Sequence, residues 1–391
     1  MIGRKQIVIL GCLLMIGLAG LCGCGSPSSD SMERVGTEAD HAADVPGGLT
    51  YESSMELQYA KNFSVDDYEG GYKILKTMDG TQILVVPEEK EVPDGISKDV
   101  VVVKQPVKNL YVVSSSIMDI FSKLDAMDTI RLSSQKEEDW YVRDAKDAME
   151  RGDILYAGKY SKPDYELIVS ENCSLAIENT MITHSPEVSE MLADFDIPTM
   201  IEYSSYESHP LGRVEWVKFF GALIGKDELA QKIFNEEVRL VDEVTSVEKT
   251  DKTVAFFYVT SNGLIQVRSS SDYVPKMIEL AGGKYIPGNI GDPDSKRSTV
   301  SMQIEDFYDQ AKDVDFIIYN SSIDGGIGSV QELLDKCAVL KDFKAVKEGN
   351  VWCTTNDMYQ QSMSIGYLIH DMHAMLQGKD QDEMTYLFHV E

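Results

Sequence analysis

From residue 100 onward, short apolar runs that are typical of strands alternate with segments of helical periodicity. Strands separated by helices of about ten residues indicate βαβ units and a parallel sheet. The first such region ends near residue 205. Within it we expect strands over 109–116, 174–180 and 197–205, helices over 117–128, 163–172 and 185–196, and a short strand or turn over 156–160.

The pattern then changes, because residues 209–247 contain two helical segments and no strand. Gly225 is the expected stop of the first helix, and Asp227 is the expected N-cap of the second. A helix of about 20 residues spans about 30 Å, which is enough to join two lobes. One apolar face of this second helix is formed by Leu229, Ile233, Val238, Val241 and Val244.

Alternation resumes beyond residue 250 and predicts a second α/β lobe. Its expected strands cover 253–260, 314–322 and 350–355, and its expected helices cover 273–283, 304–313, 329–337 and 362–376. Ahead of both lobes, residues 63–87 read as strands broken at Gly70-Gly71 and at Asp79-Gly80. Asp-Gly between alternating apolar residues is a strong hairpin signal.

The first residues have the order of a secretory signal: Arg4 and Lys5, an apolar run over 7–21, and then small residues. The run is shorter than the ~20 residues of a membrane-spanning helix. Leu21-Cys22-Gly23-Cys24 resembles the lipobox of bacterial lipoproteins, with Cys24 as the lipidated residue. Cys22 fits poorly because it would place the bulky Leu21 directly before the cleavage point.

These patterns predict an α/β fold class: two Rossmann-like lobes with parallel sheets, joined by a long α-helix and preceded by a small β-hairpin unit. The polar stretch after Cys24 lacks apolar periodicity and reads as a flexible linker. The expected segments are a signal peptide (1–23), a linker (24–50), a hairpin with an N-terminal lobe (51–205), connecting helices (206–248) and a C-terminal lobe (249–391).

The net charge of −29 narrows the classes of partner. Such an acidic chain does not bind nucleic acid by neutralising phosphates, and anionic lipid headgroups repel it. A lipid on Cys24 would then be what holds the protein at a membrane. Its acidity favours protein partners with basic surfaces.

Cysteines and histidines give no sign of catalysis. Beyond Cys24 the chain has Cys173, Cys337 and Cys353, an odd number that does not indicate a disulfide framework. No H-E-x-x-H, G-x-S-x-G or P-loop pattern occurs, and the six histidines are too dispersed for a bare zinc site. We therefore expect no enzyme, no catalytic residue and no metal-ion site.

In layout and in several segments the chain resembles the substrate-binding lipoproteins of ABC importers, in the class that serves iron-siderophores, haem and cobalamin. The resemblance implies a ligand held between two lobes. It is carried by residues 178–207, 219–234, 273–283, 300–320 and 347–360, which begin ENTMITHSPEV, FFGALIGKDEL, YVPKMIELAGG, VSMQIEDFYDQ and KEGNVWCTTND.

The resemblance implies a lipid-anchored receptor on the extracellular face of the cytoplasmic membrane, in a Gram-positive-type cell rather than a periplasm. Its ligand would be a ferric siderophore, with haem or cobalamin as the alternative and no other cofactor. Its partners would be an ABC permease with its ATPase, and we expect a monomer. A surface adhesin or ligand sensor with the same fold is the alternative from another class.

Ligands of open α/β sheets bind beyond the carboxyl ends of strands. That rule selects polar loops, although the same residues could merely cap helices and finish turns. Arg213 and Arg268 are candidate partners for carboxylate or catecholate oxygens, or else members of surface ion pairs. His184 and Met181 are candidate axial ligands if the ligand is haem. The expected ligand-binding residues are Ser115, Ser116, Tyr160, Asn179, Thr180, Met181, Arg213, Tyr258, Arg268, Asn320, Met358 and Tyr359.

The resemblance also implies two glutamates that dock on permease arginines. Glu187, directly after Pro186, matches the first position. Glu305 matches the second less closely, and Asp306 or Gln303 could take its place.

Overall fold

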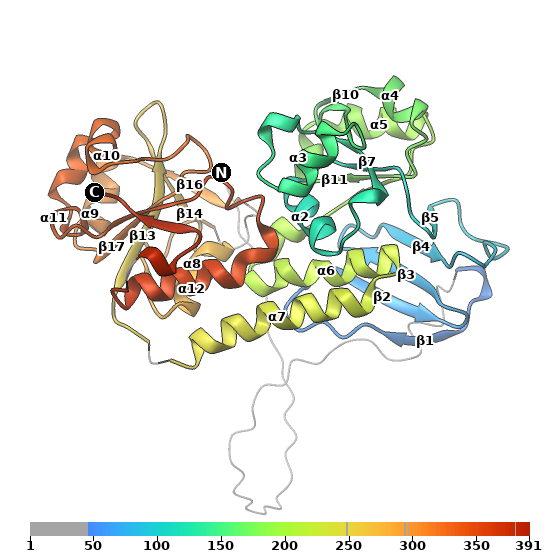
Figure 1. The fold of residues 1–391 in the computed structure, drawn as a ribbon, viewed down its shortest axis with the longest axis horizontal. Coiled ribbons are helices and arrows are strands. Elements are labelled where there is room, and N and C mark those ends of the chain that lie inside the picture. Colours follow the sequence, from blue (N-terminus) through green and yellow to red (C-terminus); the bar gives the residue numbers. More distant parts are fainter. Residues whose placement is uncertain (1–45, 248, 293–294, 296, 380) are drawn as a thin grey trace, which may run out of the picture. The chain divides into compact units, whose positions relative to one another are not determined.

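The computed structural model describes residues 46–391 except 248, 293–294, 296 and 380 (Figure 1). The predicted signal peptide, Cys24 and most of the predicted linker lie outside the described residues. Within the described part, no helix combines the length and the apolar character that crossing a membrane requires.

The predicted hairpin unit is part of a five-stranded sheet, here called the N-terminal module (residues 51–104). Its strands lie in the order of the sequence, and all neighbours are antiparallel except β4 and β5. Gly70, Gly71 and Gly80 have positive φ angles at the two predicted turns, as these tight connections require. The strands are β1 (Tyr51–Ser54), β2 (Phe63–Tyr68), β3 (Tyr72–Thr77), β4 (Gln82–Val86) and β5 (Val100–Lys104).

The first lobe contains a wholly parallel sheet in the order β12-β11-β6-β7-β8. The helix expected from Pro163 begins at Tyr165, because Asp164 caps it by accepting the Leu167 N–H, and Pro163 lies in a short strand. The strands are β6 (Leu110–Val112), β7 (Ile130–Ser133), β8 (Leu155–Tyr156), β9 (Gly158–Lys159), β10 (Lys162–Pro163), β11 (Leu175–Glu178) and β12 (Thr199–Ile201). The helices are α2 (Ser115–Lys123), α3 (Arg143–Glu150), α4 (Tyr165–Ser170) and α5 (Pro186–Asp194).

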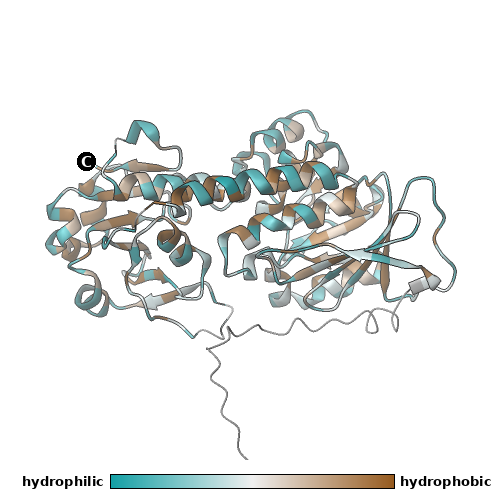
Figure 2. Cartoon of the chain, turned by 90° about the horizontal axis from the view of Figure 1, so that it is seen from below, coloured by the Kyte–Doolittle hydropathy of each residue, from teal (hydrophilic) through white to brown (hydrophobic). Residues whose placement is uncertain are grey.

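Two long helices follow, α6 (Pro210–Ile224) and α7 (Asp227–Thr245). Gly225 ends α6 in the left-handed conformation, as predicted. The N-cap of α7 is Lys226 and not Asp227, which instead supplies an acidic side chain to the first turn. Helix α7 runs beneath both lobes in Figure 1 and packs on α6, α8 and α12. In Figure 2 the long helix that crosses between the lobes alternates hydrophilic and hydrophobic residues along its length.

The sheet of the second lobe is mixed. Strands β13, β15, β17 and β18 are parallel, whereas β14, β16 and β19 pair antiparallel to their neighbours. The strands are β13 (Thr253–Val259), β14 (Ile265–Arg268), β15 (Lys284–Tyr285), β16 (Thr299–Met302), β17 (Phe316–Tyr319), β18 (Val351–Thr354) and β19 (Leu387–His389). The helices are α8 (Tyr273–Leu280), α9 (Ile304–Ala311), α10 (Val330–Lys336), α11 (Lys344–Lys347) and α12 (Ile365–Leu376).

The lobes also touch directly, through the segment that precedes and begins α12. The Met363 N–H donates to the buried Asp119 carboxylate of α2 at 2.7 Å, and the Gly366 N–H donates to Glu237 of α7 at 2.8 Å. Gln360 bridges to the first lobe with its side-chain amide, which accepts from the Tyr141 N–H and donates to the Asp139 carbonyl, both at 2.8 Å.

Candidate ligand cleft between the lobes

A cavity of about 1420 Å³, here called the cleft, lies between the two lobes. Typical small-molecule sites occupy ~300–1,000 Å³, so the cleft has room for a bulky ligand. Its first-lobe wall comes from loops that follow β6, β11 and β12, and its second-lobe wall comes mainly from β14, β16 and the loops near them. The described residues around it include Ser114, Glu202, Ser205, Tyr206, Gln266, Ser269, Tyr273, Arg297, Ser298, Thr299, Ser301 and Ile323.

The cleft brings together most of the residues selected from the sequence. Three of them follow β11, where Asn179 caps a short 3-10 helix by accepting the Met181 N–H. His184, which with Met181 was a candidate haem ligand, also lines the cleft. The selected residues found here are Ser116, Asn179, Thr180, Met181, Arg213, Tyr258, Arg268 and Tyr359.

Four selected residues lie elsewhere. Ser115 and Met358 line a neighbouring cavity of about 190 Å³ under α2, and Met358 is almost fully buried. Asn320 is buried as well, and its amide donates to the Tyr359 hydroxyl at 2.9 Å, so it supports a cleft residue from behind. Tyr160 packs against the apolar cluster of the first lobe instead of facing the cleft.

Arg268 belongs to a buried ion pair. Its guanidinium donates to both Asp272 oxygens at 2.8 and 2.7 Å and to the Tyr359 hydroxyl at 3.2 Å. Burial by itself would lower the pKa of Arg268, but Tyr359 and Asp272 outweigh it and the pKa is raised. The charge therefore persists while its geometry is fixed, and the ion pair that stood as the alternative reading of Arg268 is an internal one, not a surface one.

Arg213, near the start of α6, is held differently. Its guanidinium lies 3.7 Å from the centre of the Tyr273 ring and donates to the Ser205 carbonyl at 2.6 Å. Among the described residues no carboxylate lies within ion-pair distance of it. Arg213 thus brings to the cleft a positive charge that the described residues do not neutralise.

Arg297, an exposed residue before β16, was not selected from the sequence, although it lines the same cleft. Neither were Tyr273 and the side chains of Gln266, Thr299 and Ser301. The alternation of Gln266 and Arg268 with the buried Ile265 and Val267 is a strand signal that could have identified β14. No comparable pattern precedes Arg297.

Two buried glutamates belong to the first-lobe side of the cleft: Glu202 lines it, and Glu178 directly precedes the cleft residue Asn179. Glu202 accepts the Ser114 hydroxyl at 2.7 Å and the Ser204 N–H at 2.8 Å. Glu178, the last residue of β11, has no hydrogen-bond partner on either side-chain oxygen among the described residues, and neither does the nearby Tyr111 hydroxyl. Burial raises the pKa of Glu178 to about 8, so this side chain is mostly a neutral acid at pH 7.

The described residues contain no group of three or more His, Cys, Asp or Glu side chains arranged to hold a metal ion. His209 caps α6 by accepting the Leu211 N–H and stacks on Tyr59. Cys173, Cys337 and Cys353 are free thiols. Burial raises the pKa of Cys173 and of Cys353 to about 11, so neither is a thiolate at neutral pH.

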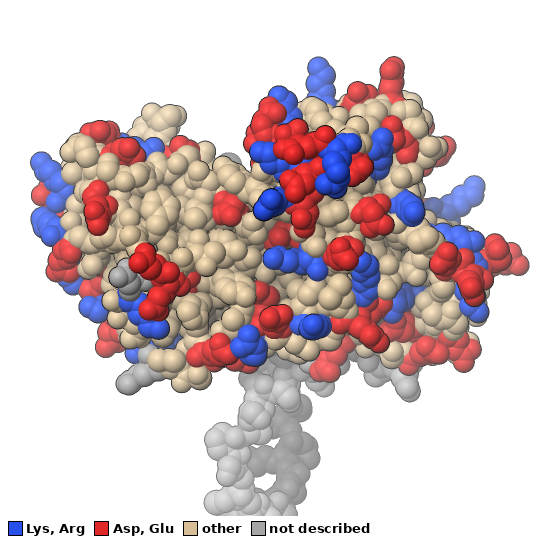
Figure 3. Space-filling model, viewed as in Figure 1, with Lys and Arg blue, Asp and Glu red and all other residues tan. Residues whose placement is uncertain are grey.

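The predicted docking glutamates are both exposed, each in the first turn of a helix. Glu187 follows Pro186 at the start of α5, and Glu305 with Asp306 begins α9. Each helix belongs to a different lobe. Figure 3 shows charged side chains of both signs crowded over α3 of the first lobe, whereas much of the second lobe's visible face is uncharged.

No family model matches the chain. Two uncharacterized lipoproteins of Methanocaldococcus jannaschii are similar in sequence. One is 22% identical over 378 residues, covering 91% of this chain and 89% of its own. The other is 23% identical over 405 residues, covering 99% of this chain and all of its own.

Three solved structures are similar in fold. A periplasmic binding protein from Veillonella parvula has a TM-score of 0.58 at 15% identity and covers 82% of this chain and 99% of its own. This chain therefore has the two-lobed fold of periplasmic binding proteins. A possible iron-binding, periplasmic solute-binding protein from Staphylococcus epidermidis shares this fold, with a TM-score of 0.55 at 16% identity over 70% of this chain and 99% of its own. The periplasmic haem-binding protein HutB of Vibrio cholerae also shares it, with a TM-score of 0.54 at 13% identity over 67% of this chain and 97% of its own.

Coverage differs between the two kinds of comparison. The Staphylococcus and Vibrio structures match over almost their whole length and still leave about a third of this chain without a counterpart. The archaeal lipoproteins extend over nearly all of it. The chain therefore carries more than the two lobes that make up the binding-protein fold.

Proposed function

We propose that this protein is a lipid-anchored receptor that captures a ferric siderophore between its lobes and delivers it to an ABC importer. The cleft carries this proposal. It is large and lined by hydroxyl and amide groups, and it receives guanidinium groups from Arg213 and Arg297, while Arg268 lies in its wall paired with Asp272. Guanidinium groups bind carboxylate and catecholate oxygens through paired, charge-assisted hydrogen bonds. A bulky anionic chelate fits this combination.

Haem is the second candidate, and one observation favours it. Met181 and His184, side chains of types that ligate haem iron, both line the first-lobe wall and are exposed. The haem propionates would form ion pairs with the same arginines. Cobalamin offers these arginines a single phosphodiester as its anionic group and is the weaker variant.

Delivery to a permease is supported by the positions of Glu187 and Glu305. Each is an exposed carboxylate at a helix start, one on each lobe, as docking on two permease subunits requires. Anchoring would come from a lipid on Cys24, and the lipoprotein names of the archaeal relatives support it. The working location would be the outer face of the cytoplasmic membrane.

The proposal can be tested by titrating the purified protein with a ferric tris-catecholate, ferric citrate, haemin and cyanocobalamin. Fluorescence from Trp140, Trp216 and Trp352 would report binding. We expect the ferric catecholate to bind most tightly, and Arg213→Ala to weaken it at least about tenfold because a charge-assisted contact is lost. Arg239→Ala on α7, which removes an exposed arginine outside the cleft, is the matched control.

Tight binding of haemin alone, with a shifted Soret band, would replace the siderophore with haem as the ligand. The receptor proposal itself would fail if none of the four compounds bound and the protein purified from its native source carried no chromophore.

A further inference from the structure

A second cavity of about 300 Å³, here called the side chamber, adjoins the cleft. The two share wall residues, among them Ser205, Tyr206 and Arg297, so a ligand in the cleft that contacts Arg297 also borders the side chamber. Lys61 and Asn62 form another part of the chamber wall. These two residues precede β2, so the N-terminal module reaches the binding region.

Two buried glutamates, one on α6 and one in the loop before it, hold this part of the wall in place. Glu215 accepts the N–H groups of Gln58, Tyr59 and Ala60 at 2.8 to 2.9 Å. Glu207 accepts those of Lys61 and Asn62 at 3.0 and 2.9 Å. Five consecutive backbone donors are thus fixed on α6 and the loop before it, and hydrogen bonds to carboxylates are among the stronger ones in proteins.

The carboxylates of the chamber are already engaged. Glu207 is occupied by the segment just described and by the Trp216 indole, which donates at 3.3 Å. Asp272 is occupied by Arg268 and by the Val274 N–H that it caps. The cations are not engaged, because within the described residues no carboxylate pairs with the side chain of Lys61 or Arg297. Beside the hydroxyls of Ser208 and Ser271, the chamber therefore offers two positive charges that no described carboxylate pairs.

We infer that the side chamber binds an anionic, oxygen-rich arm of the same chelate whose metal core occupies the cleft. Lys61, supplied by the N-terminal module, contacts the arm, and Arg297 stands between arm and core. This inference rests on the proposed function. It gives the N-terminal module a part in ligand selection. A chelate that carries a carboxylate beyond its metal core gains a contact that a chelate without this carboxylate lacks.

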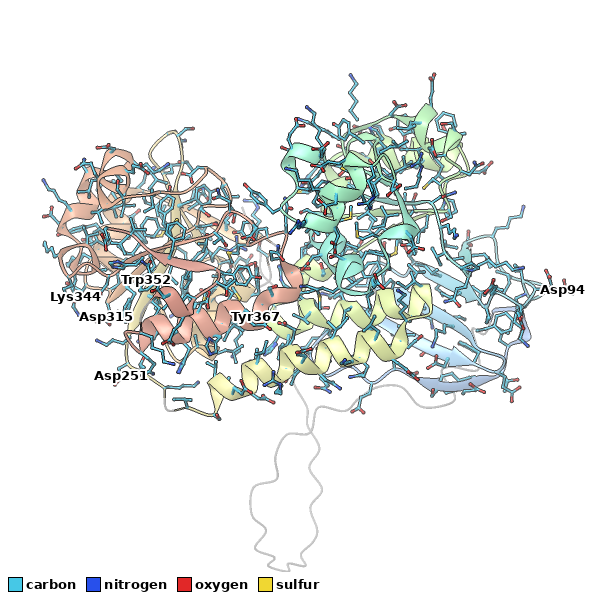
Figure 4. All side chains as sticks on the ribbon, viewed as in Figure 1. Asp94, Asp251, Asp315, Lys344, Trp352 and Tyr367 are labelled. Atoms are coloured by element: carbon cyan, nitrogen blue, oxygen red, sulfur yellow. The ribbon has the colours of Figure 1, made fainter. Side chains whose placement is uncertain are left out.

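The test compares two ferric tris-catecholate chelates that differ only in one pendant carboxylate, with wild type, Lys61→Gln, Lys98→Gln and Arg213→Ala. Lys98 is an exposed lysine of the same module that lines neither cavity, in the outer loop marked by Asp94 in Figure 4. Isothermal titration would give the ratio of the two affinities for each protein. Thermal melting would verify that every variant folds.

We expect wild type to prefer the carboxylate-bearing chelate by about five- to tenfold, Lys61→Gln to lose most of that preference, and Lys98→Gln to keep it. An equal preference in wild type and Lys61→Gln, with both chelates weakened by Arg213→Ala, would overturn the side chamber and leave the receptor intact. If neither chelate bound to wild type, both the side chamber and the ferric siderophore as the ligand would be overturned, and the titration with haemin and cyanocobalamin would then decide the receptor itself.

Discussion

The two walls of the cleft are built by different means. On the first lobe, short loops after parallel strands present side chains such as Asn179 and Thr180. On the second lobe, the antiparallel strands β14 and β16 present Gln266, Arg268 and Thr299 from their faces. Side chains on a paired strand have less freedom than those of loops, because the ladder fixes their spacing and direction.

The buried charges differ in the same way. In the second lobe Arg268 and Asp272 neutralise each other beneath the cleft. In the first lobe the Glu178 side chain is buried without a partner in the described part of the chain, and it avoids the cost of a buried charge by keeping its proton. From this comparison we expect the ion pair to keep the second-lobe wall rigid, and we expect the stability of the first-lobe wall to depend on pH.

Asp272→Ala should produce the largest effect. It leaves the Arg268 charge buried without its carboxylate and also removes the cap of α8. Removing one partner of a buried pair costs about 3–5 kcal/mol of unfolding free energy, and equilibrium denaturation would measure it. Asp242→Ala on α7, where no ion pair is lost, serves as the control. A loss below about 1 kcal/mol would mean that solvent reaches Arg268 and that this wall is not rigid.

Glu178→Gln examines the first-lobe wall. The folded-state pKa of about 8 lies above the ordinary value of 4.5, so between these values the folded protein keeps a proton that the unfolded chain has lost. Wild-type stability should therefore fall as pH rises from about 4.5 to about 8, and the glutamine variant should lack this part of the decline. At pH 8 the variant should be about 3 kcal/mol more stable than wild type, and at pH 5 the two should be similar.

Denaturation curves at pH 5, 6.5 and 8 would decide the matter. Glu187→Gln, an exposed neighbour in the same lobe, should show no such pH dependence. If the difference in unfolding free energy between the variant and wild type were the same at all three pH values, Glu178 would have a partner and stay ionised.

The contrast between the walls also explains what could be predicted from the sequence. Alternating strands and helices identified both lobes, and Gly225 marked the end of α6. The strand-end rule found Asn179, Thr180 and Tyr258, because parallel strands place their carboxyl ends at one edge. It could not tell that Asn320 turns inward to support Tyr359, because strand-end residues point both ways.

Other features had no local pattern to reveal them. Strands β16 and β19 are short edge strands, and their pairing depends on partners far away in the sequence. Arg297 follows a polar stretch without periodicity. The contacts of Glu215 and Glu207 with residues 58–62 join positions more than 140 apart along the chain, and only the folded structure shows them. Long-range contacts of this kind decide the site more than local propensity does.

The smallest effect concerns whether the two walls move as one. Gln360 connects them by two hydrogen bonds, one from the Tyr141 N–H and one to the Asp139 carbonyl. Gln360→Ala should cost about 1 kcal/mol and should raise the hydrogen-exchange rate of the Tyr141 amide by about tenfold, since that amide loses its acceptor. Gln331→Ala on α10, which removes an exposed pair within one helix, should leave this amide unchanged. If the Tyr141 amide were equally protected without Gln360, the contact between the lobes would depend on the other hydrogen bonds of this segment, those to Asp119 and Glu237 and the one from the Ser362 hydroxyl to the Ser116 carbonyl.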